Sequence, residues 1–391
     1  MSERVRVIEL IQHLALGGGT MQAMVLAERL DPARYEVTLA AGAGAGAEGN
    51  MLAEMQERGI RVVIVPHLVR SPHPLHDPLA LGALRELIVR ERPQIVDTHG
   101  SKPKLLLPLV ARVVPVPVRI AHIAGWEWQV AGGALGEALL TEVSRLGAAA
   151  WDALIPCSHA TARQGIERGI GSPEQYHPVW PPVDLQQFRP DGREQARAQV
   201  RAEWGMRDDD LVIISVLRLA PQKAPLDLIA AADLVMADSA RARLVLVGGG
   251  PMQEQVESEI ARRGMADRVL MLGPRRDLPR LLKAADVFAL LSAWEPFGMV
   301  FAEAAAVGLP SVGTRVDGIP EAVAEGRSGL LVEPGDLQGA AAAILRIGSD
   351  PELARRLGEG GIEHARAFSA ERFIAETAAV YQRCLAAEGI G

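Results

Sequence analysis

Residues 287–314 read VFALLSAWEPFGMVFAEAAAVGLPSVGT, and this stretch decides the fold. It opens with a short apolar run, Val287–Leu290, and closes with a second one, Pro310–Thr314. Between them lie a loop and an alanine-rich segment, Met299–Val307, that favours a helix. Two near-continuous apolar strands joined by a helix are typical of a parallel sheet that is buried on both faces.

The same alternation runs from residue 5 to residue 332. Short apolar runs predict strands, and longer amphipathic segments such as 79–90 and 226–236 predict the helices between them. Twelve strands exceed what one open sheet usually holds, so we expect an α/β protein with two doubly wound, Rossmann-like domains. The expected strands are Val5–Ile11, Tyr35–Ala40, Arg61–Val65, Gln94–Thr98, Val118–His122, Ala153–Cys157, Leu211–Leu217, Arg243–Val247, Val269–Leu272, Val287–Leu290, Pro310–Thr314 and Gly329–Val332.

A proline-rich segment, Trp180–Asp184, interrupts this alternation and precedes a polar helix, Arg193–Trp204. We therefore expect one domain over residues 1–184 and a second over residues 185–369. The last helix, Ala370–Ala387, has no strand of its own. We expect this terminal segment, 370–391, to pack back on the first domain.

Composition excludes several classes of protein. The 41 basic and 48 acidic residues give a net charge of −7, which argues against a nucleic-acid partner. Two cysteines in 391 residues fit neither a disulfide-stapled scaffold nor a CxxC metal site. We find no signal peptide and no apolar run of ~18 residues, so we expect a cytoplasmic enzyme or binding protein without a transmembrane segment. Peripheral contact with a membrane stays open, and nothing in the sequence fixes the oligomeric state.

Candidate site residues follow the predicted strands, because ligands of open parallel sheets bind beyond the carboxyl ends of the strands. Gly17–Gly19 follow the first strand and open a helix, which suits an anionic group such as a phosphate. Arg218 and Lys223 follow the first strand of the second half, where two cations can clamp a diphosphate. A further turn, Asp317–Glu321, offers backbone donors at a helix start.

The quoted stretch carries the strongest signal. Glu295 lies in its loop, and the amides of Gly298, Met299 and Val300 open its helix, which makes an anion site. Glu303 lies inside that otherwise apolar helix, where a carboxylate is costly unless it is paired or faces a ligand. Two glutamates beside an anion site can accept hydrogen bonds from sugar hydroxyls.

These segments resemble one known family in their order and spacing. They are similar to the retaining glycosyltransferases of family 4, which have the GT-B fold. The segments that carry this resemblance are Arg218 to Lys223, the eight-residue step from Glu295 to Glu303, Ala304–Pro310, Gly318–Glu321 and Gly329–Asp336. Gly248–Pro251, Ala285–Phe288, Asp97–Lys102 and Arg119–His122 resemble it too. One departure is Pro181-Pro182-Val183-Asp184, where the family usually has Asn-Gly-Val-Asp.

The resemblance implies a fold and a set of roles. Two Rossmann-like domains would face a central cleft, the first binding an acceptor and the second a nucleotide sugar. Arg218 and Lys223 would hold the diphosphate, Glu303 the ribose hydroxyls, and Glu295 would face the donor sugar. His122 would lie near the transferred sugar. Further donor contacts would come from Gly18, Gly19, Gly249, Phe297, Gly298, Met299 and Val300.

The expected activity is the transfer of a sugar from a nucleoside diphosphate sugar to an acceptor hydroxyl with retention of configuration. A UDP-sugar is the favoured donor, and we expect the reaction to need neither a metal nor a cofactor. Two alternatives stay open: a nucleotide-sugar epimerase of the same fold, and a catalytically silent nucleotide-sugar binding protein. Gly44-x-Gly46-x-x-Gly49 matches a dinucleotide fingerprint, but its next strand ends in Val65-Pro66-His67 without the required acid. Asp208–Asp210 contains an Asp-x-Asp that could hold a metal, yet it precedes a strand and is expected to be a solvated turn.

Overall fold

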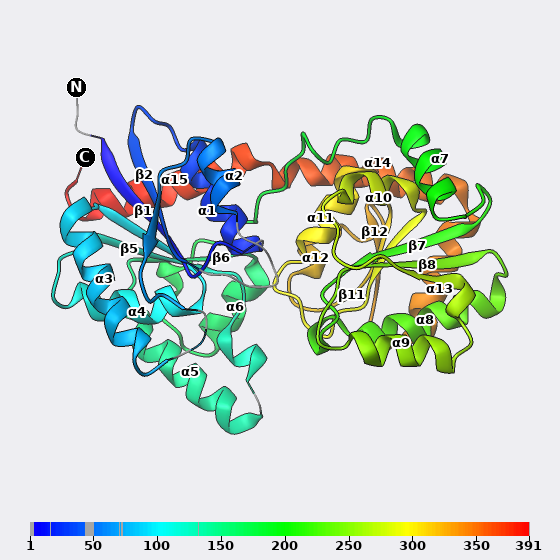
Figure 1. Ribbon diagram of the computed structural model, residues 1–391, viewed down its shortest axis with the longest axis horizontal. Coiled ribbons are helices and arrows are strands. Elements are labelled where there is room, and N and C mark those ends of the chain that lie inside the picture. The colour runs from blue at the N-terminus through cyan, green and yellow to red at the C-terminus, as the bar shows by residue number, and fades with distance from the viewer. Residues whose placement is uncertain are drawn as a thin grey trace. The chain divides into compact units, whose positions relative to one another are not determined.

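In the computed structural model, the described residues, 4–15, 17–43, 51–69, 71, 73–131 and 133–390, form two six-stranded parallel sheets. Residues 1–182 and 370–391 make up one unit, called unit 1, and residues 183–369 make up unit 2. Figure 1 labels their elements. All twelve expected strands are confirmed, each to within two residues at either end.

Unit 1 has the strand order β3-β2-β1-β4-β5-β6. The order reverses between β1 and β4, which is where ligands bind in sheets of this type. The strands are β1 (Val5–Ile11), β2 (Tyr35–Gly42), β3 (Val62–Val65), β4 (Ile95–His99), β5 (Val118–Ile123) and β6 (Ala153–Pro156). The helices are α1 (Gly18–Arg29), α2 (Leu52–Glu57), α3 (His76–Glu91), α4 (Ser101–Ala111), α5 (Ala134–Ala148), α6 (His159–Glu167) and α15 (Ala370–Ala387).

Unit 2 repeats this topology with the order β12-β11-β10-β7-β8-β9, which reverses between β7 and β10. Its strands are β7 (Leu211–Val216), β8 (Ala242–Val247), β9 (Val269–Met271), β10 (Val287–Leu290), β11 (Ser311–Thr314) and β12 (Gly329–Val332). Its helices are α7 (Arg193–Glu203), α8 (Pro225–Asp238), α9 (Gln253–Arg262), α10 (Leu278–Ala284), α11 (Met299–Ala306), α12 (Ile319–Ala322), α13 (Leu337–Ser349) and α14 (Pro351–Ala365).

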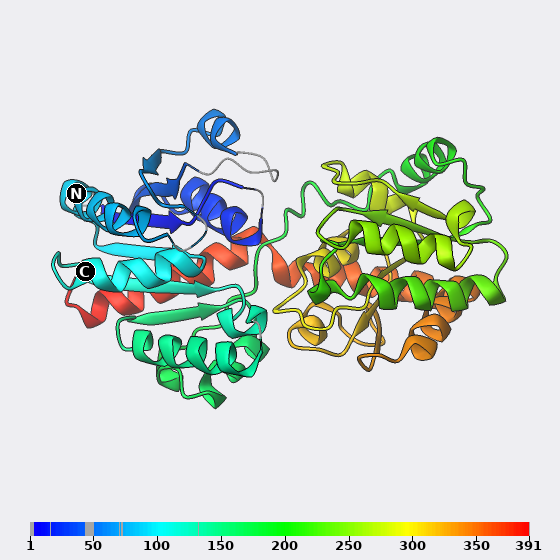
Figure 2. The same cartoon turned by 60° about the horizontal axis from the view of Figure 1, so that its bottom comes forward.

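Successive residues of each strand point to opposite faces, so the sheet of unit 1 has a core on each side. Helices α3 and α4 cover one face, where Ile8 and Leu10 are buried. Helix α15 covers the other, where Val7, Ile95 and Ile120 pack with side chains of α15. Figures 1 and 2 both show α15, in red, beside the strands of unit 1. The last helix of the chain is therefore part of the first core.

The chain passes from unit 1 to unit 2 after Pro182 and returns after Ser369. The two crossover points are neighbours, because the Val183 N–H donates to the Phe368 carbonyl at 2.8 Å and Val183 bridges Ser369. Among the described residues, no helix has both the length and the apolar character needed to cross a membrane.

Three arginines one turn apart fix α7 to the start of the unit 2 sheet. Arg193 donates to the carbonyls of Gly308 and Ala285, and Arg197 donates to Asp286 at 2.6 Å. Arg201 is 1% exposed and donates to Asp286 at 2.7 Å. Its other donors reach the carbonyls of Ala284, Arg207, Asp208 and Asp210. The polar helix read from the sequence is thus attached through buried charge-assisted hydrogen bonds.

We expect Arg201→Met to lower the free energy of unfolding of unit 2 by about 3 kcal/mol, because it leaves buried carbonyls without donors and removes the buried ion-pair partner of Asp286. Arg197→Met is the matched control and should cost about 1 kcal/mol or less, since that side chain is 29% exposed. Urea unfolding compares the two variants. Equal losses of unfolding free energy in the two variants would contradict the conclusion that the buried Arg201 attaches α7 more strongly than Arg197 does.

Candidate functional site

The topology of unit 2 brings four loops together at one edge of its sheet. Strands β8, β7, β10 and β11 are successive neighbours, and each ends at that edge. The four loops that follow contain Gly249, Arg218 with Lys223, Glu295, and Asp317 with Gly318. Residues from 218 to 318 along the chain thus reach a common location, because parallel strands end on the same side.

Glu295 and Lys223 form an ion pair at this edge. The Lys223 ammonium contacts Oε2 of Glu295, and the two side chains are 17% and 8% exposed. The Ser292 hydroxyl donates to the same carboxylate oxygen at 3.4 Å. The loops are also joined by their backbones, since the Ala293 N–H donates to the Gln222 carbonyl at 2.9 Å. Two residues predicted to contact different parts of a ligand therefore hold each other in place in the ligand-free protein.

The loop that follows β11 fixes the backbone of Glu295. The Glu295 N–H donates to Oδ2 of Asp317 at 2.9 Å, and the Gly318 N–H donates to the Glu295 carbonyl at 3.0 Å. A Cβ at Gly318 would lie 2.0 Å from the Pro296 carbonyl oxygen, so only glycine allows this approach. The sequence predicted only backbone donors in this turn. The structure adds the side chain of Asp317, which orients Glu295.

Arg218 is exposed, and its side chain has no partner among the residues that the structure describes. The glycine loop after β8 packs directly beside it. A Cβ at Gly248 would lie 1.9 Å from the Leu217 carbonyl oxygen, whereas one at Gly249 would make only ordinary contacts. The steric constraint on this loop therefore falls on Gly248 and not on Gly249, where a Cβ would lie at ordinary van der Waals distance from Pro274 and Gln253.

Helix α11 begins where the sequence predicted. Gly298 precedes it with a φ of 86°, a left-handed conformation that favours glycine. Phe297 is buried, whereas Met299 and Val300 are half-buried. The amides of a helix's first turn have no partner inside the helix, so this end attracts an anion.

Glu303 lies one turn into α11 and is the least satisfied carboxylate of this edge. Its Oε2 atom is buried and has no hydrogen-bond partner among the described residues. Burial raises the pKa of the Glu303 carboxyl from 4.5 to about 7. A buried carboxylate that lacks a partner and has a raised pKa is a candidate for a functional site.

The predicted residues of unit 1 also lie at the ends of its strands. Gly18 and Gly19 form the first turn of α1, and Gly17 precedes it. His122 lies near the end of β5, is 4% exposed, and its Nε2 atom lies 2.9 Å from Oδ2 of Asp97. The sequence analysis quoted Asp97 within a motif but missed it as the partner of His122. The signal available was an acid within a strand that is buried along its whole length.

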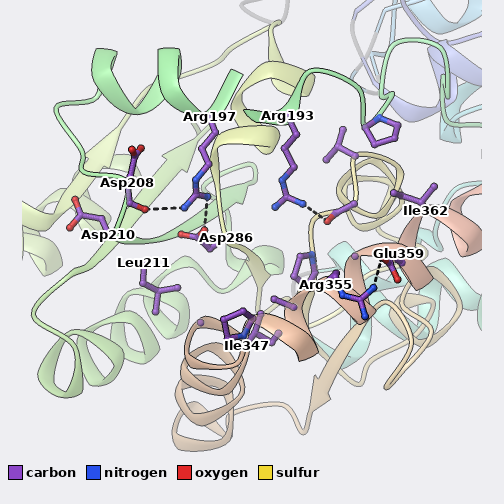
Figure 3. A pocket seen from close by; sticks show the side chains of 18 of the residues that line it. Arg193, Arg197, Asp208, Asp210, Leu211, Asp286, Ile347, Arg355, Glu359 and Ile362 are labelled. Atoms are coloured by element: carbon purple, nitrogen blue, oxygen red, sulfur yellow. Dashed lines mark hydrogen bonds and ion pairs between the residues drawn. The ribbon is translucent and has the colours of Figure 1, made fainter. Parts of the chain in front are cut away.

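A cavity of about 610 Å³ lies at the opposite edge of the unit 2 sheet (Figure 3). It is lined by Leu211 at the start of β7 and by residues that precede β10 and β11. Its arginines are already bonded: Arg193 and Arg197 to Asp286 or to backbone carbonyls, and Arg355 to Glu352 and Glu359. The cavity is therefore not a ready anion site. Asp208–Asp210 lie here too. The prediction that they form a solvated turn is wrong for Asp210, which is 5% exposed and accepts a hydrogen bond from the Arg207 N–H at 2.9 Å.

Asp97, His99 and His122 offer atoms within 4.8 Å of one another, which is close enough to share a metal ion. However, both histidine Nε2 atoms already lie within 2.9 Å of a carboxylate oxygen. The dinucleotide fingerprint Gly44–Gly49 lies outside the described residues.

Two family models match this chain. One, described as glycosyl transferases group 1, matches residues 196–364, and the other, described as glycosyltransferase family 4, matches residues 16–187. The chain is 36% identical to a D-inositol 3-phosphate glycosyltransferase of Saccharomonospora viridis over 60% of this chain. That match spans 56% of the relative, a little over half of its length. An N-acetyl-alpha-D-glucosaminyl L-malate synthase of Bacillus anthracis is 27% identical over 79% of this chain and 80% of its own.

Solved structures share the fold of the whole chain. Anabaena HepE in complex with UDP and glucose superimposes with a TM-score of 0.80 at 20% identity, covering 97% of this chain and 100% of that one. Sucrose-phosphate synthase from Thermosynechococcus elongatus gives 0.82 at 22% identity, covering 98% and 100%. At these identities the likeness establishes the fold, which consists of two Rossmann-like domains.

We expect Glu303→Gln to stabilise the ligand-free protein in a pH-dependent way. The folded protein binds this proton more tightly than the unfolded chain, so wild-type stability falls as the pH rises from about 4.5 to about 7, and the loss persists above 7. The variant lacks this titration and should gain about 1–3 kcal/mol over wild type between pH 5 and pH 8 in urea unfolding.

Glu257→Gln, on the exposed surface of α9, is the matched control and should show no such difference. A Glu303→Gln effect of equal size at both pH values would show that Glu303 does not titrate in this range.

Proposed function

The chain belongs to the group 1 glycosyltransferases of the GT-B fold, and we propose that it transfers a sugar from a nucleoside diphosphate sugar to an acceptor hydroxyl with retention at the anomeric carbon. The observation that carries this proposal is the edge of the unit 2 sheet. It combines two cations, a helix N-terminus and two carboxylates, which is the set of groups that a nucleotide sugar requires. A UDP-sugar is favoured, because the Anabaena relative of this fold is described in complex with UDP-glucose.

The diphosphate would bind between Arg218, Lys223 and the first turn of α11. Arg218 is available for a phosphate because its side chain has no partner among the described residues. The Lys223 ammonium contacts Glu295 and still has two N–H donors for phosphate oxygens. These fixed positive groups stabilise the charge that develops on the leaving diphosphate without a metal ion.

The two glutamates would recognise the hydroxyl groups. Glu303 offers a buried carboxylate oxygen without a partner, which suits a pair of ribose hydroxyls. Glu295 is held at its backbone by Asp317 and at its side chain by Lys223, so it can present its carboxylate to the donor sugar without reorganising. The predicted contacts of Gly18, Gly19 and His122 with the donor remain part of this proposal.

In the proposed reaction, the bond between the anomeric carbon and the phosphate oxygen breaks, and the acceptor oxygen bonds to the same face of that carbon. The acceptor's proton passes to the departing phosphate oxygen, so the step balances without an additional base. The protein supplies charge stabilisation and alignment. The acceptor is left unassigned beyond its hydroxyl group. A cytoplasmic location fits Cys157 and Cys384, which are buried thiols.

We expect Arg218→Ala and Lys223→Ala each to lower kcat for release of UDP from a UDP-sugar by about 100-fold, the size of the loss when one anion donor is removed from an active site. Arg241→Ala is the control, because Arg241 pairs with Asp209 at the opposite edge of the same sheet. Full activity of both site variants would contradict the proposal that Arg218 and Lys223 bind the diphosphate.

The same assay separates the two alternatives. An epimerase would convert the donor without any acceptor, and a silent binding protein would bind UDP without turning over any donor.

We expect UDP-glucose to bind more tightly as the pH rises towards 8, because only the ionised Glu303 accepts two hydroxyl hydrogen bonds fully. Glu303→Gln should weaken binding at pH 8 by about 10- to 100-fold and remove the pH dependence. Isothermal titration calorimetry at pH 6 and pH 8 measures both effects. Combined with higher ligand-free stability, this result would identify Glu303 as a ligand-binding carboxylate; unchanged affinity would place the ribose elsewhere.

A further inference from the structure

Five polar side chains are buried together beneath α15 in unit 1. Glu9, Asp97 and Tyr381 have no exposed surface, and His99 and His122 are 3% and 4% exposed. They come from three neighbouring strands and the last helix. Glu9 pairs with Asp97 in the register of β1 and β4, and His99 pairs with His122 in the register of β4 and β5. This polar cluster lies within an otherwise apolar core that includes Val7, Ile95 and Phe373.

The cluster forms one chain of hydrogen bonds. His99 Nε2 lies 2.8 Å from Oε2 of Glu9, and the Tyr381 hydroxyl lies 2.8 Å from Oε1 of the same carboxyl group. That hydroxyl also lies 2.6 Å from Oδ2 of Asp97, and this oxygen lies 2.9 Å from His122 Nε2. The two imidazole rings stack with their centroids 4.3 Å apart.

Counting hydrogens shows that one carboxyl group carries a proton. A tyrosine hydroxyl has a single hydrogen, yet it lies between two carboxylate oxygens at hydrogen-bond distance. If both acids were ionised, one of these short oxygen–oxygen contacts would have no hydrogen in it. Two like charges this close in a desolvated core also cannot both persist. A proton on one acid satisfies every link of the chain.

The surroundings place the proton on Glu9. Oδ2 of Asp97 lies within hydrogen-bond distance of both the Tyr381 hydroxyl and the His122 ring, whereas each oxygen of Glu9 has one such neighbour. Oδ1 of Asp97 is buried and has no partner among the described residues. Burial and the charge of Asp97 raise the pKa of Glu9 well above its ordinary value. Burial would also raise the pKa of Asp97, but the hydrogen bonds from the His122 ring and the Tyr381 hydroxyl hold it below its ordinary value. Burial lowers the pKa of His99 to about 3, so His99 is neutral.

We propose that the group formed by Glu9, Tyr381 and Asp97 carries a single negative charge and that this charge lies on Asp97. Asp97 is thereby a positioning residue that fixes His122 with its proton on Nε2. With the proton on Nε2, the atom that can accept a hydrogen bond is Nδ1, which has no partner among the described residues. The link to catalysis rests on the proposed function, in which His122 serves the transferred sugar. The charge and the tautomer are properties of unit 1 that can be measured without it.

The proposal predicts different kcat values for two isosteric variants, Glu9→Gln and Asp97→Asn. Glu9→Gln replaces a neutral acid by a neutral amide, whose NH2 can donate to Tyr381 and whose oxygen can accept from His99. We expect its kcat to remain within about 3-fold of wild type. Asp97→Asn removes the charge, and we expect kcat to fall about 100-fold with little change in KM for the donor, as for other residues that orient a functional histidine.

The contrary outcomes are distinct. Equal losses in the two variants would mean that the cluster only packs the core. A tolerated Asp97→Asn with an inactive Glu9→Gln would place the charge on Glu9. Tighter folding of wild type in the presence of Zn²⁺, lost in Asp97→Asn, would make the cluster a metal site. Each of these results overturns the proposal.

Nuclear magnetic resonance on wild type decides the same point even where a variant fails to fold. At pH 7 the Glu9 side-chain carbon should resonate as a carboxylic acid, and long-range ¹H–¹⁵N spectra should show His122 protonated on Nε2. A carboxylate signal from Glu9, or a proton on Nδ1 alone, would overturn the assignment. If wild type releases no UDP from any UDP-sugar, the proposed function fails while these spectra still decide the charge and the tautomer.

Discussion

The pairing of Glu9 with Asp97 in the register of β1 and β4 is a strong constraint on unit 1. Parallel pairing of β1 with β4 places these two acids side by side on a face that must be buried. Such a pair is tolerated only when a hydrogen-bonding group lies between the acids and one of them is neutral. The Tyr381 hydroxyl supplies that group from the last helix of the chain. The chain must therefore return from unit 2 before the first core is complete, which explains the paired crossovers at Val183 and Ser369.

Unit 2 treats its charges differently at the two edges of its sheet. At the edge where the strands begin, Arg193, Arg197 and Arg201 are satisfied by Asp286 and by carbonyl groups, and they hold α7 in place. At the edge where the strands end, Arg218 and the Oε2 atom of Glu303 have no partners among the described residues. Satisfied buried charges are compatible with stability, whereas a buried carboxylate oxygen without a partner costs stability and is retained where a ligand can complete it. The contrast separates the structural edge from the candidate donor site.

The sequence predicted most of the architecture because the relevant signals are local. Each apolar strand is bounded by turns and helices within about 20 residues, and glycines such as Gly298 mark the positions where a helix begins. Arg218, Lys223, Glu295 and Glu303 could be selected because each follows a predicted strand or interrupts an apolar helix. Asp317 was overlooked because it acts on the backbone of Glu295, a contact across 22 residues that no spacing rule indicates.

The sequence by itself determined the two repeated sheets, the position of the crossover segment and the family to which the chain belongs, because periodicity and motif spacing are properties of neighbouring residues. Tertiary structure alone decided which charges meet. Glu9 and Tyr381 are 372 positions apart, yet they share a hydrogen bond in a core that only the return of α15 closes. Strand order and helix packing set such contacts, and both depend on the burial of apolar surface over the whole unit. For that reason, the partner that holds His122 became visible only in three dimensions.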